Sequence, residues 1–241
     1  MLSIILPSIR PHNLDKLYHS IICDCFELII ISPYDLPDCL KQYKNIKYVR
    51  DFGSPVRASQ IGATLAEGKY ITWMADDGVY INSLDNIIKM LNNDDNTKNV
   101  VCCKYTEGDG IVHNDNYYLL QNAYPYVSCV KSNWWIFNLG IMHTSYFNSL
   151  GGWDCSFETT ALSHADLALR AQLDNASVNM LQTVLIECTH MPNITGDHAP
   201  VHYAHTEHDA NFYSIKNQHP QIKIDINNWK NSPKIWSRRF V

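Results

Sequence analysis

Continuous apolar runs alternate with helix-spaced apolar positions over the first hundred residues of the chain. The runs are short and bounded by polar or glycine-marked turns, which predicts buried strands at 2–7, 26–32, 46–49, 69–74 and 99–105. Apolar residues three and four positions apart predict helices at 12–22, 54–68 and 83–93. Such alternation predicts an α/β domain with a mainly parallel central sheet and helices on both faces.

The second half of the chain has a less regular pattern. Residues 106–133 show little periodicity, which is typical of a long functional loop. Further elements are expected as a strand at 134–142, a glycine-marked turn at 151–158, a helix at 163–173 and a strand at 184–190. The His-, Pro- and Asn-rich tail from residue 191 is expected to wrap the domain, so that the chain forms one unit.

Composition narrows the class of protein. The 241 residues are 46% hydrophobic and 18% charged, which indicates a globular domain with a sizeable core. A net charge of −5 without a basic stripe argues against nucleic-acid binding. The eight cysteines lack metal-type spacing, and no secretory signal or membrane-spanning stretch is evident. We therefore expect reduced thiols and a cytoplasmic protein, in an infected host cell if the Asn-, Ile-, Lys- and Tyr-rich composition reflects a viral genome.

Two adjacent carboxylates, Asp76 and Asp77, follow the fourth predicted strand in "ITWMADDGVY". Ligands of parallel sheets bind beyond the carboxyl ends of the strands, and polar residues past the first and third strands should reach the same edge. Mg²⁺ and Mn²⁺ accept carboxylate and phosphate oxygens, and such a cation would relieve the repulsion between the two acids. The alternative is a simple turn in which Asp77-Gly78 ends the strand.

Four stretches of the chain together resemble the inverting family-2 glycosyltransferases of GT-A fold. They are "SIILPSIRP" at the N-terminus, "DFGSPVRASQIGATLAEGKYITWMADDGVY" (51–80), "NLGIMHTSYFNSLGGWDCSFE" (138–158) and "SHADLALRAQ" (163–172). The resemblance covers roughly residues 1–185. It implies transfer of a sugar from a nucleotide-diphosphate donor, UDP first and GDP next, to the hydroxyl of a glycan or glycoprotein acceptor. It also implies inversion with a general base, and Mn²⁺ or Mg²⁺ at the leaving diphosphate.

The resemblance also implies a division of the single domain 1–241 and a set of site residues. A nucleotide-binding half (1–105) and an acceptor and catalytic half (106–190) would precede the tail (191–241). The base would be Asp166 or His164, with Glu158 and Asp154 on the preceding loop in reserve. The donor would contact Pro7, Ser8, Arg10, Asp51, Arg57, Gln60 and Asp76, the metal would be held by Asp77 and Asp76, and Trp135, Gly152, Trp153 and Asp154 would lie on the acceptor side. Apart from the resemblance, one histidine of the histidine-rich tail could complete the metal site, and His190 and His198 are the candidates.

The chain departs from the family pattern at three places. Ala75-Asp76-Asp77 replaces the usual D-x-D, Ser32-Pro33 replaces an acid at the second strand end, and Ser163-His164 replaces the usual Glu-Asp. These changes motivate a second hypothesis, a catalytically degenerate domain that binds a sugar nucleotide or glycan. A sugar nucleotidyltransferase is disfavoured, because that class requires a glycine-rich phosphate loop after the first strand. The segment "LPSIRP" at this place has no glycine.

Several other residues have a structural alternative. Asp166 is four residues before Arg170, so the two could form a helix ion pair without any catalytic role. A zinc site from His202, His205 and His208 is a rival use of the tail histidines. The Trp residues near Arg238 and Arg239 are expected to anchor the tail, with a partner or membrane surface as the alternative.

Overall fold

The computed structural model describes residues 1–108, 112–113, 135–136, 138–188 and 196–240. These residues form a nine-stranded sheet in the order β3-β2-β1-β4-β8-β6-β9-β5, with β7 paired to β6. The strands are β1 (Leu2–Pro7), β2 (Phe26–Ser32), β3 (Ile46–Arg50), β4 (Tyr70–Trp73), β5 (Gly78–Tyr80), β6 (Asn99–Thr106), β7 (Val112–His113), β8 (Gly140–His143) and β9 (Ser177–Cys188).

The sheet is parallel where the sequence alternates regularly and mixed beyond β4. Strands β3, β2, β1 and β4 are all parallel neighbours. Strand β8 runs antiparallel to both β4 and β6, β9 is parallel to β6, and β5 is antiparallel to β9. Helical crossovers place successive strands parallel to each other. Strand β5, in contrast, follows β4 through a tight turn and pairs with β9 instead of β4. The parallel half therefore brings the ends of β1 to β4 to one edge.

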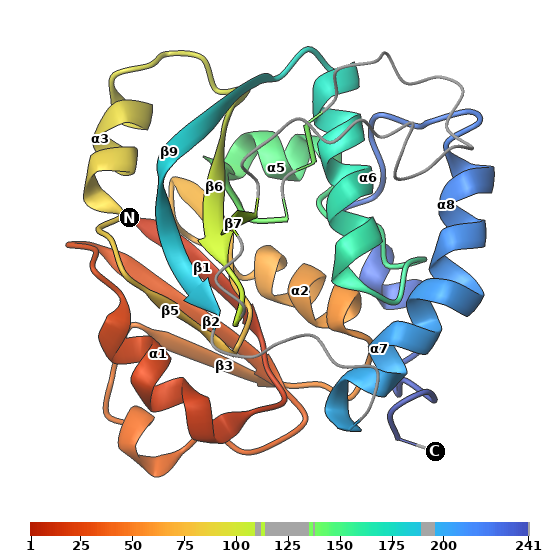
Figure 1. Cartoon of the computed structure of the whole chain (residues 1–241), viewed down its shortest axis with the longest axis horizontal. Coiled ribbons are helices and arrows are strands. Elements are labelled where there is room, and N and C mark those ends of the chain that lie inside the picture. The colour runs from red at the N-terminus through yellow and green to blue at the C-terminus, as the bar shows by residue number, and fades with distance from the viewer. Residues whose placement is uncertain (109–111, 114–134, 137, 189–195, 241) are drawn as a thin grey trace.

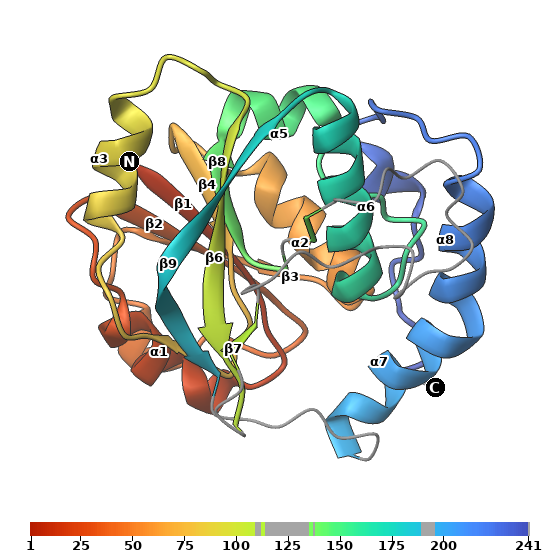
Figure 2. The ribbon, with the colours of Figure 1, turned by 45° about the horizontal axis from the view of Figure 1, so that its top comes forward.

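The helices cover both faces of the sheet (Figures 1 and 2). Helices α1 and α3 lie on one face, and α2, α5 and α6 lie on the other, with α7 and α8 outside α6. The α-helices are α1 (Leu14–Ser20), α2 (Pro55–Thr64), α3 (Asp85–Asn92), α5 (Thr144–Leu150), α6 (Thr160–Leu173), α7 (Ala199–Ala204) and α8 (Ala210–Lys216). The shorter turns are η1 (Pro11–Asn13), η2 (Asp38–Leu40), η3 (Gly196–His198), η5 (Asn228–Asn231) and a π-helical turn, η4 (His205–Asp209).

Two differences from the predicted elements matter for the site. Within the described part of the expected strand 134–142, only the residues from Gly140 onward belong to a strand, β8. The tail, for which no helix was predicted, contains α7, η4 and α8. Its apolar positions are too sparse to show a helical period, so its helices depend on packing against the domain.

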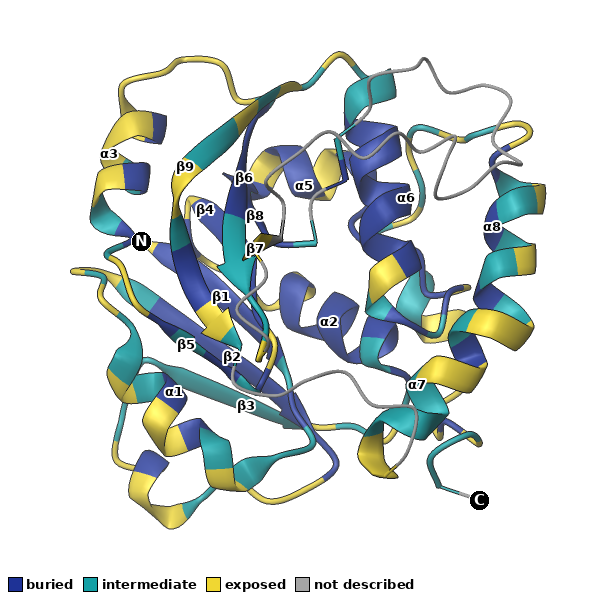
Figure 3. Cartoon of the chain, viewed as in Figure 1, coloured by how far each residue is buried: buried dark blue, intermediate teal, exposed yellow. Residues whose placement is uncertain are grey.

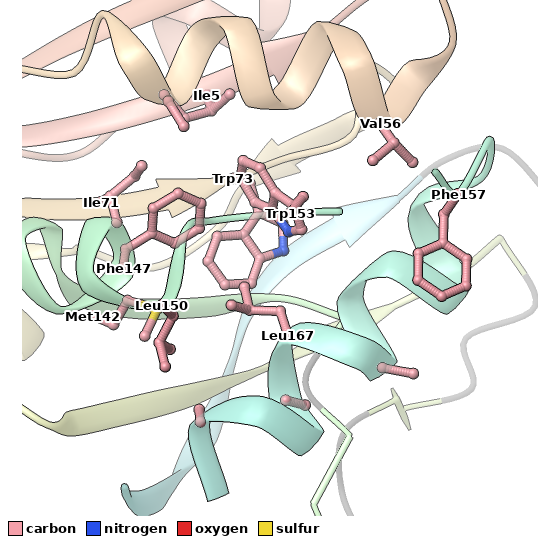
Figure 4. Packing of buried hydrophobic residues seen from close by; sticks show 14 of the residues in the cluster. Ile5, Val56, Ile71, Trp73, Met142, Phe147, Leu150, Trp153, Phe157 and Leu167 are labelled. Carbon is pink, nitrogen blue, oxygen red and sulfur yellow. The ribbon is translucent and has the colours of Figure 1, made fainter. Parts of the chain in front are cut away.

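Buried apolar residues fill both faces of the sheet (Figure 3). On the α2–α5–α6 face the indole of Trp153 packs beside Trp73 and Phe147, with ring centroids 5.2 and 4.7 Å away (Figure 4). Helix α2 begins as expected, because the Ser54 side chain accepts a hydrogen bond from the Arg57 amide. A Cβ on Gly62 would lie 2.5 Å from the Ile31 side chain, so the small residue lets α2 lie directly on the parallel strands.

The tail packs along α2 and the turn after α5. Ile235 forms a parallel bridge with Phe52, and the Ile224 amide donates to the Leu150 carbonyl at 3.1 Å. Gly151 ends α5 with a left-handed φ of 86°, and a Cβ there would lie 2.1 Å from the Ile224 carbonyl oxygen. The glycine-marked turn is therefore a docking point for the tail.

Candidate active site

A cavity of about 380 Å³ lies at the carboxyl ends of the parallel strands. The polar residues on its wall come from β6 and the segments after β1, β3, β4 and β6, from α2, from the segment before β8, from the start of α6, and from the tail. They are Ser8, Arg10, Asp51, Ser59, Asp76, Asp77, Tyr105, Glu107, Asn138, Thr160, His164, Asp197, His198 and Arg239. Apolar wall residues include Pro7, Pro33, Trp73, Trp236 and Phe240.

Asp76 is held by the loop that follows β1. Its Oδ2 accepts hydrogen bonds from the Ile9 and Arg10 amides at 2.8 and 2.9 Å and from the Ser8 hydroxyl at 3.1 Å. Its Oδ1 pairs with the Arg10 guanidinium. Only 5% of Asp76 is exposed. Because protein donors already engage both oxygens, Asp76 serves to fasten the two loops, and it fits poorly as a metal ligand.

Arg10 connects the acidic pair to the tail. Its Nε donates to Asp197 Oδ2 at 2.9 Å, and its second terminal nitrogen lies 2.8 Å from His198 Nε2. Burial alone would lower the pKa of Arg10, but the nearby carboxylates, first Asp76 and then Asp77, raise it overall. Arg10 is therefore a charged hub that joins three parts of the cavity wall.

The predicted donor residues divide into two groups. Pro7, Ser8, Arg10, Asp51 and Asp76 line the cavity. Arg57 and Gln60 lie on α2 outside the described lining, and their assignment as donor contacts stays a prediction.

Both α2 side chains hold the backbone in place. Arg57 donates to Asp51 at 3.1 Å and to the Trp229 carbonyl in the tail. Gln60 bonds the Gly151 and Ile226 carbonyls and the Trp153 amide.

His164 is the one base candidate of the three that reaches the cavity in the described structure. Its ring lies 5.5 Å from that of Trp73 and 5.9 Å from that of Trp153. Burial lowers the pKa of His164 to about 3, so the imidazole is neutral at physiological pH. A neutral imidazole can accept a proton, although its low pKa makes it a weak base.

Asp166 is not among the residues that line the described cavity, and its assignment as a base stays a prediction. It is fully buried and pairs with Arg170 at 2.7 Å, as the alternative helix ion pair predicted, and also with Lys216 from α8. Arg170 further donates to the Leu150 and Gly152 carbonyls. Asp166 and Arg170, from the family-like stretch "SHADLALRAQ", thus belong to a buried polar network that joins α6 to the glycine turn and the tail.

The other two carboxylates proposed for catalysis do not line the described cavity and are paired with cations from the tail. Glu158 accepts from Arg238 at 2.6 Å and from the Trp236 indole at 3.1 Å, while Asp154 pairs with Lys216 at 2.8 Å. Burial would raise the pKa of Asp154, but the Lys216 charge lowers it overall. The partner cations come from tail segments that sequence spacing does not bring near, and the catalytic roles of both carboxylates stay predictions.

The predicted acceptor-side residues have structural roles as well. Trp153 is fully buried in the core, and Gly152 adopts a left-handed φ of 69° where a Cβ would meet Gln60. The Trp135 amide and carbonyl both bond the Gln172 side chain on α6. None of these residues lies on the wall among the described residues, and their assignment to an acceptor surface stays a prediction.

The predicted metal ligands lie in different places, and metal binding stays a prediction. Asp77 and His198 line the cavity with Asp76, while His190 falls outside the described residues. Across the described ranges, no three His, Cys, Asp or Glu side chains are grouped as a metal site, and this includes the rival set in the tail, His202, His205 and His208. Asp77 is the carboxylate whose oxygen chemistry suits Mg²⁺ or Mn²⁺ at this place.

Three wall residues from the C-terminus were not predicted as site residues. Trp236, Arg239 and Phe240 line the cavity. Trp236 is only 3% exposed, and Arg238 pairs with Glu158 and Glu207, so this segment is not an exposed aromatic and basic patch. The alternation of aromatic and basic residues in "WSRRF" was the available signal.

Negative charge dominates the described wall of the cavity. Five carboxylates, Asp51, Asp76, Asp77, Glu107 and Asp197, face two guanidinium groups, Arg10 and Arg239. A nucleotide diphosphate would add further negative charge. Binding of the nucleotide diphosphate would therefore depend on where positive charges lie on this cavity wall.

The sheet and the cavity beyond the ends of its parallel strands are those of an α/β nucleotide-sugar transferase fold. This confirms the predicted fold class. The particular similarity is to S. aureus TarS. A 1–349 fragment of TarS in complex with UDP superposes with a TM-score of 0.57 at 15% identity, covering 79% of this chain and 61% of that one. The same fragment in complex with UDP-GlcNAc gives a TM-score of 0.54 at 15% identity, covering 82% and 60%.

The remaining comparisons add the following. A further TarS structure superposes with a TM-score of 0.53 at 14% identity, covering 79% of this chain and 37% of that one. No family model matches the chain, and no curated protein matches it in sequence. Among the described helices, none combines the length and apolar character needed to cross a bilayer.

Proposed function

We propose that the chain is a glycosyltransferase that moves a sugar from a nucleotide-diphosphate donor to an acceptor hydroxyl with inversion. One observation carries the proposal. The acidic pair Asp76–Asp77 stands at the end of β4 on the wall of a cavity in a nucleotide-sugar transferase fold. UDP is the favoured nucleotide and GDP the next, and the UDP complex of the similar TarS fragment supports that order. A glycan or glycoprotein is the proposed acceptor.

The cavity residues have separable tasks under this proposal. Arg10 and Asp76 hold the β1 and β4 loops together, so that the donor meets a fixed wall. His164, neutral and packed between two indoles, is the proposed acceptor of the hydroxyl proton. Trp73 and Trp236 exclude water from the same wall.

A divalent cation, Mn²⁺ or Mg²⁺, is part of the proposal, with Asp77 as its protein ligand. Such ions commonly bind one or two carboxylates and complete their shell with phosphate oxygens and water. When bound, the cation would neutralise charge on the leaving diphosphate. The excess of carboxylates on the described wall supports a bound cation.

A first test is the melting temperature with UDP, GDP, CMP or dTDP, each with and without Mn²⁺. A ligand that binds the native state stabilises it according to its concentration relative to its Kd. A cation-dependent rise with one diphosphate would support the proposal and identify the nucleotide. No rise with any nucleotide would contradict it.

The change Asp77→Asn should remove both the cation-dependent rise and transferase activity, the latter by about a hundredfold or more. Asp95→Asn is the matched control, because Asp95 is exposed and lies outside the described cavity wall. Wild-type turnover by Asp77→Asn would show that the cation assignment is wrong.

A catalytically degenerate binding domain is the second candidate. It is favoured by one observation: burial lowers the pKa of His164 to about 3, and the other two proposed bases are paired elsewhere. This candidate predicts that UDP-sugars bind without hydrolysis or transfer. Measuring release of free UDP from a bound UDP-sugar separates the two functions.

A further inference from the structure

The last residues of the chain form a strap across the cavity wall, defined here as residues 235–240. The strap is attached at its start, where Ile235 bridges to Phe52 and the Trp236 amide donates to the Phe52 carbonyl at 2.8 Å. Beyond this attachment, Trp236, Arg239 and Phe240 line the cavity. A segment far from the strands in sequence thus supplies part of the nucleotide-facing wall.

Two adjacent arginines on the strap have different partners. Arg238 is neutralised by two glutamates, Glu158 at 2.6 Å and Glu207 at 2.8 Å. Arg239 donates instead to the backbone carbonyl of Asp197 at 2.7 Å and stacks over Trp236 at 5.7 Å. In the part of the chain that the structure describes, Arg239 has no ion pair with a carboxylate. Its charge is therefore available to an anion in the cavity.

The surroundings of Arg239 favour an anionic ligand. The side chain is half-buried, and burial lowers the pKa of Arg239. The neighbouring Arg10 charge lowers this pKa further, and the Asp197 carboxylate offsets part of the decrease. Arg10 itself already pairs with Asp76 and Asp197. A guanidinium that is partly desolvated and not ion-paired gains most from a phosphate, because it can donate two parallel hydrogen bonds.

We propose that Arg239 binds the diphosphate of the donor nucleotide, so that the C-terminal strap completes the donor site. This inference rests on the proposed function and assigns a diphosphate contact to a residue outside the four motifs of the sequence resemblance. Trp236 acts as a positioning residue, since its ring supports the Arg239 guanidinium and its backbone holds the strap to Phe52. Arg10 positions the facing wall.

The test compares Arg239→Gln with Arg238→Gln, two neutralised arginines one residue apart on the same strap. Isothermal titration with UDP and with uridine measures the Kd of each ligand for the full-length wild type and both variants. Arg239→Gln should weaken UDP binding by about tenfold or more, because a charge-assisted hydrogen-bond pair is lost, and should leave uridine within about twofold. Arg238→Gln should leave both ligands within about twofold of wild type. Melting temperatures without ligand check that both variants fold.

Each other outcome has a distinct meaning. If Arg239→Gln weakens UDP and uridine equally, or Arg238→Gln weakens UDP as strongly, the strap only shapes the wall and the proposal is overturned. If UDP affinity is unchanged in Arg239→Gln, the diphosphate contacts other groups and the proposal is again overturned. If the wild type binds no nucleoside diphosphate, the proposed function itself fails. A charge-retaining variant, Arg239→Lys, should recover part of the lost UDP affinity but not all of it.

Discussion

At the scale of single residues, burial and partners decide what each polar side chain does. Asp76 and Asp77 are adjacent and chemically alike, yet Asp76 has protein donors on both oxygens. Asp166 lies two residues from His164 on α6, but it points into a buried ion-pair network, whereas His164 lines the cavity. Residue type and spacing identify candidates, and only the surroundings separate a ligand from a structural contact.

Acid should destabilise the wild-type chain more than a His164→Leu variant. Burial lowers the pKa of His164 from 6.5 to about 3, so between these values the unfolded chain binds a proton that the folded chain does not. The free energy of unfolding therefore falls as pH drops through this window, by up to about 1.4 kcal/mol per pH unit from this group. Urea unfolding across the window measures the difference. Above pH 6.5 the free energies of unfolding of the two proteins should change in parallel with pH. If they also change in parallel below pH 6.5, the buried neutral imidazole is contradicted.

At the scale of elements, the tail organises the helix that carries His164. Asp209, at the end of the π-helical turn η4, is fully buried and lies at the start of α6. It accepts hydrogen bonds from the Glu158 and Thr159 amides at 2.9 and 2.7 Å and from the Thr159 hydroxyl at 2.6 Å. A carboxylate at this position satisfies amides near a helix N-terminus and interacts favourably with its dipole. The tail therefore fixes where α6 begins.

Replacing this carboxylate should loosen the start of α6. Asp209→Ala leaves buried amide and hydroxyl donors unsatisfied, so we expect a loss of about 2–4 kcal/mol in the free energy of unfolding. Glu207→Ala, in the same turn, removes an exposed ion pair with Arg238 and should cost less than about 1 kcal/mol. Urea denaturation of the two variants measures both effects. Equal losses would mean that Asp209 has no special role at the helix start.

At the scale of the whole molecule, side chains on α2 join segments that lie far apart in the chain. Gln60 is fully buried, and its amide bonds the Gly151 carbonyl at 3.0 Å, the Ile226 carbonyl at 2.8 Å and the Trp153 amide at 2.8 Å. One side chain thus connects the parallel half, the glycine turn and the tail. These connections also position the strap, because the chain passes α2 at Ile226 before it reaches the strap.

Replacing Gln60 by Leu should destabilise the fold and release the tail. Three buried backbone groups would lose their partner, which predicts a loss of about 3 kcal/mol or more in the free energy of unfolding. Gln42→Leu is the matched control, since Gln42 is exposed and bonds only the Cys39 carbonyl through its side chain among the described contacts. Limited proteolysis, read by mass spectrometry, should show earlier cleavage in 219–240 for Gln60→Leu alone. Unchanged cleavage would show that other contacts hold the tail.

The sequence by itself determined the parallel half of the molecule and the place of its site. Strands β1 to β4, helix α2 and its Ser54 cap follow from hydrophobic period and local capping, which depend on residues a few positions apart. The acidic pair was found for the same reason, because parallel strands bring their carboxyl ends to one edge.

Only the tertiary structure decided which polar residues face the cavity. Gln60, Trp153 and Asp166 lie within the family-like stretches of the sequence. Each is buried against segments that hydrophobic periodicity along the chain does not bring near. The contact between Gln60 and the Ile226 carbonyl spans 166 positions, and the strap containing Arg239 meets strand ends from the other end of the chain. Burial depends on the final packing of distant segments, whereas periodicity depends on near neighbours. That physical difference is why the elements and the edge could be predicted, and why the roles of the individual side chains required the fold.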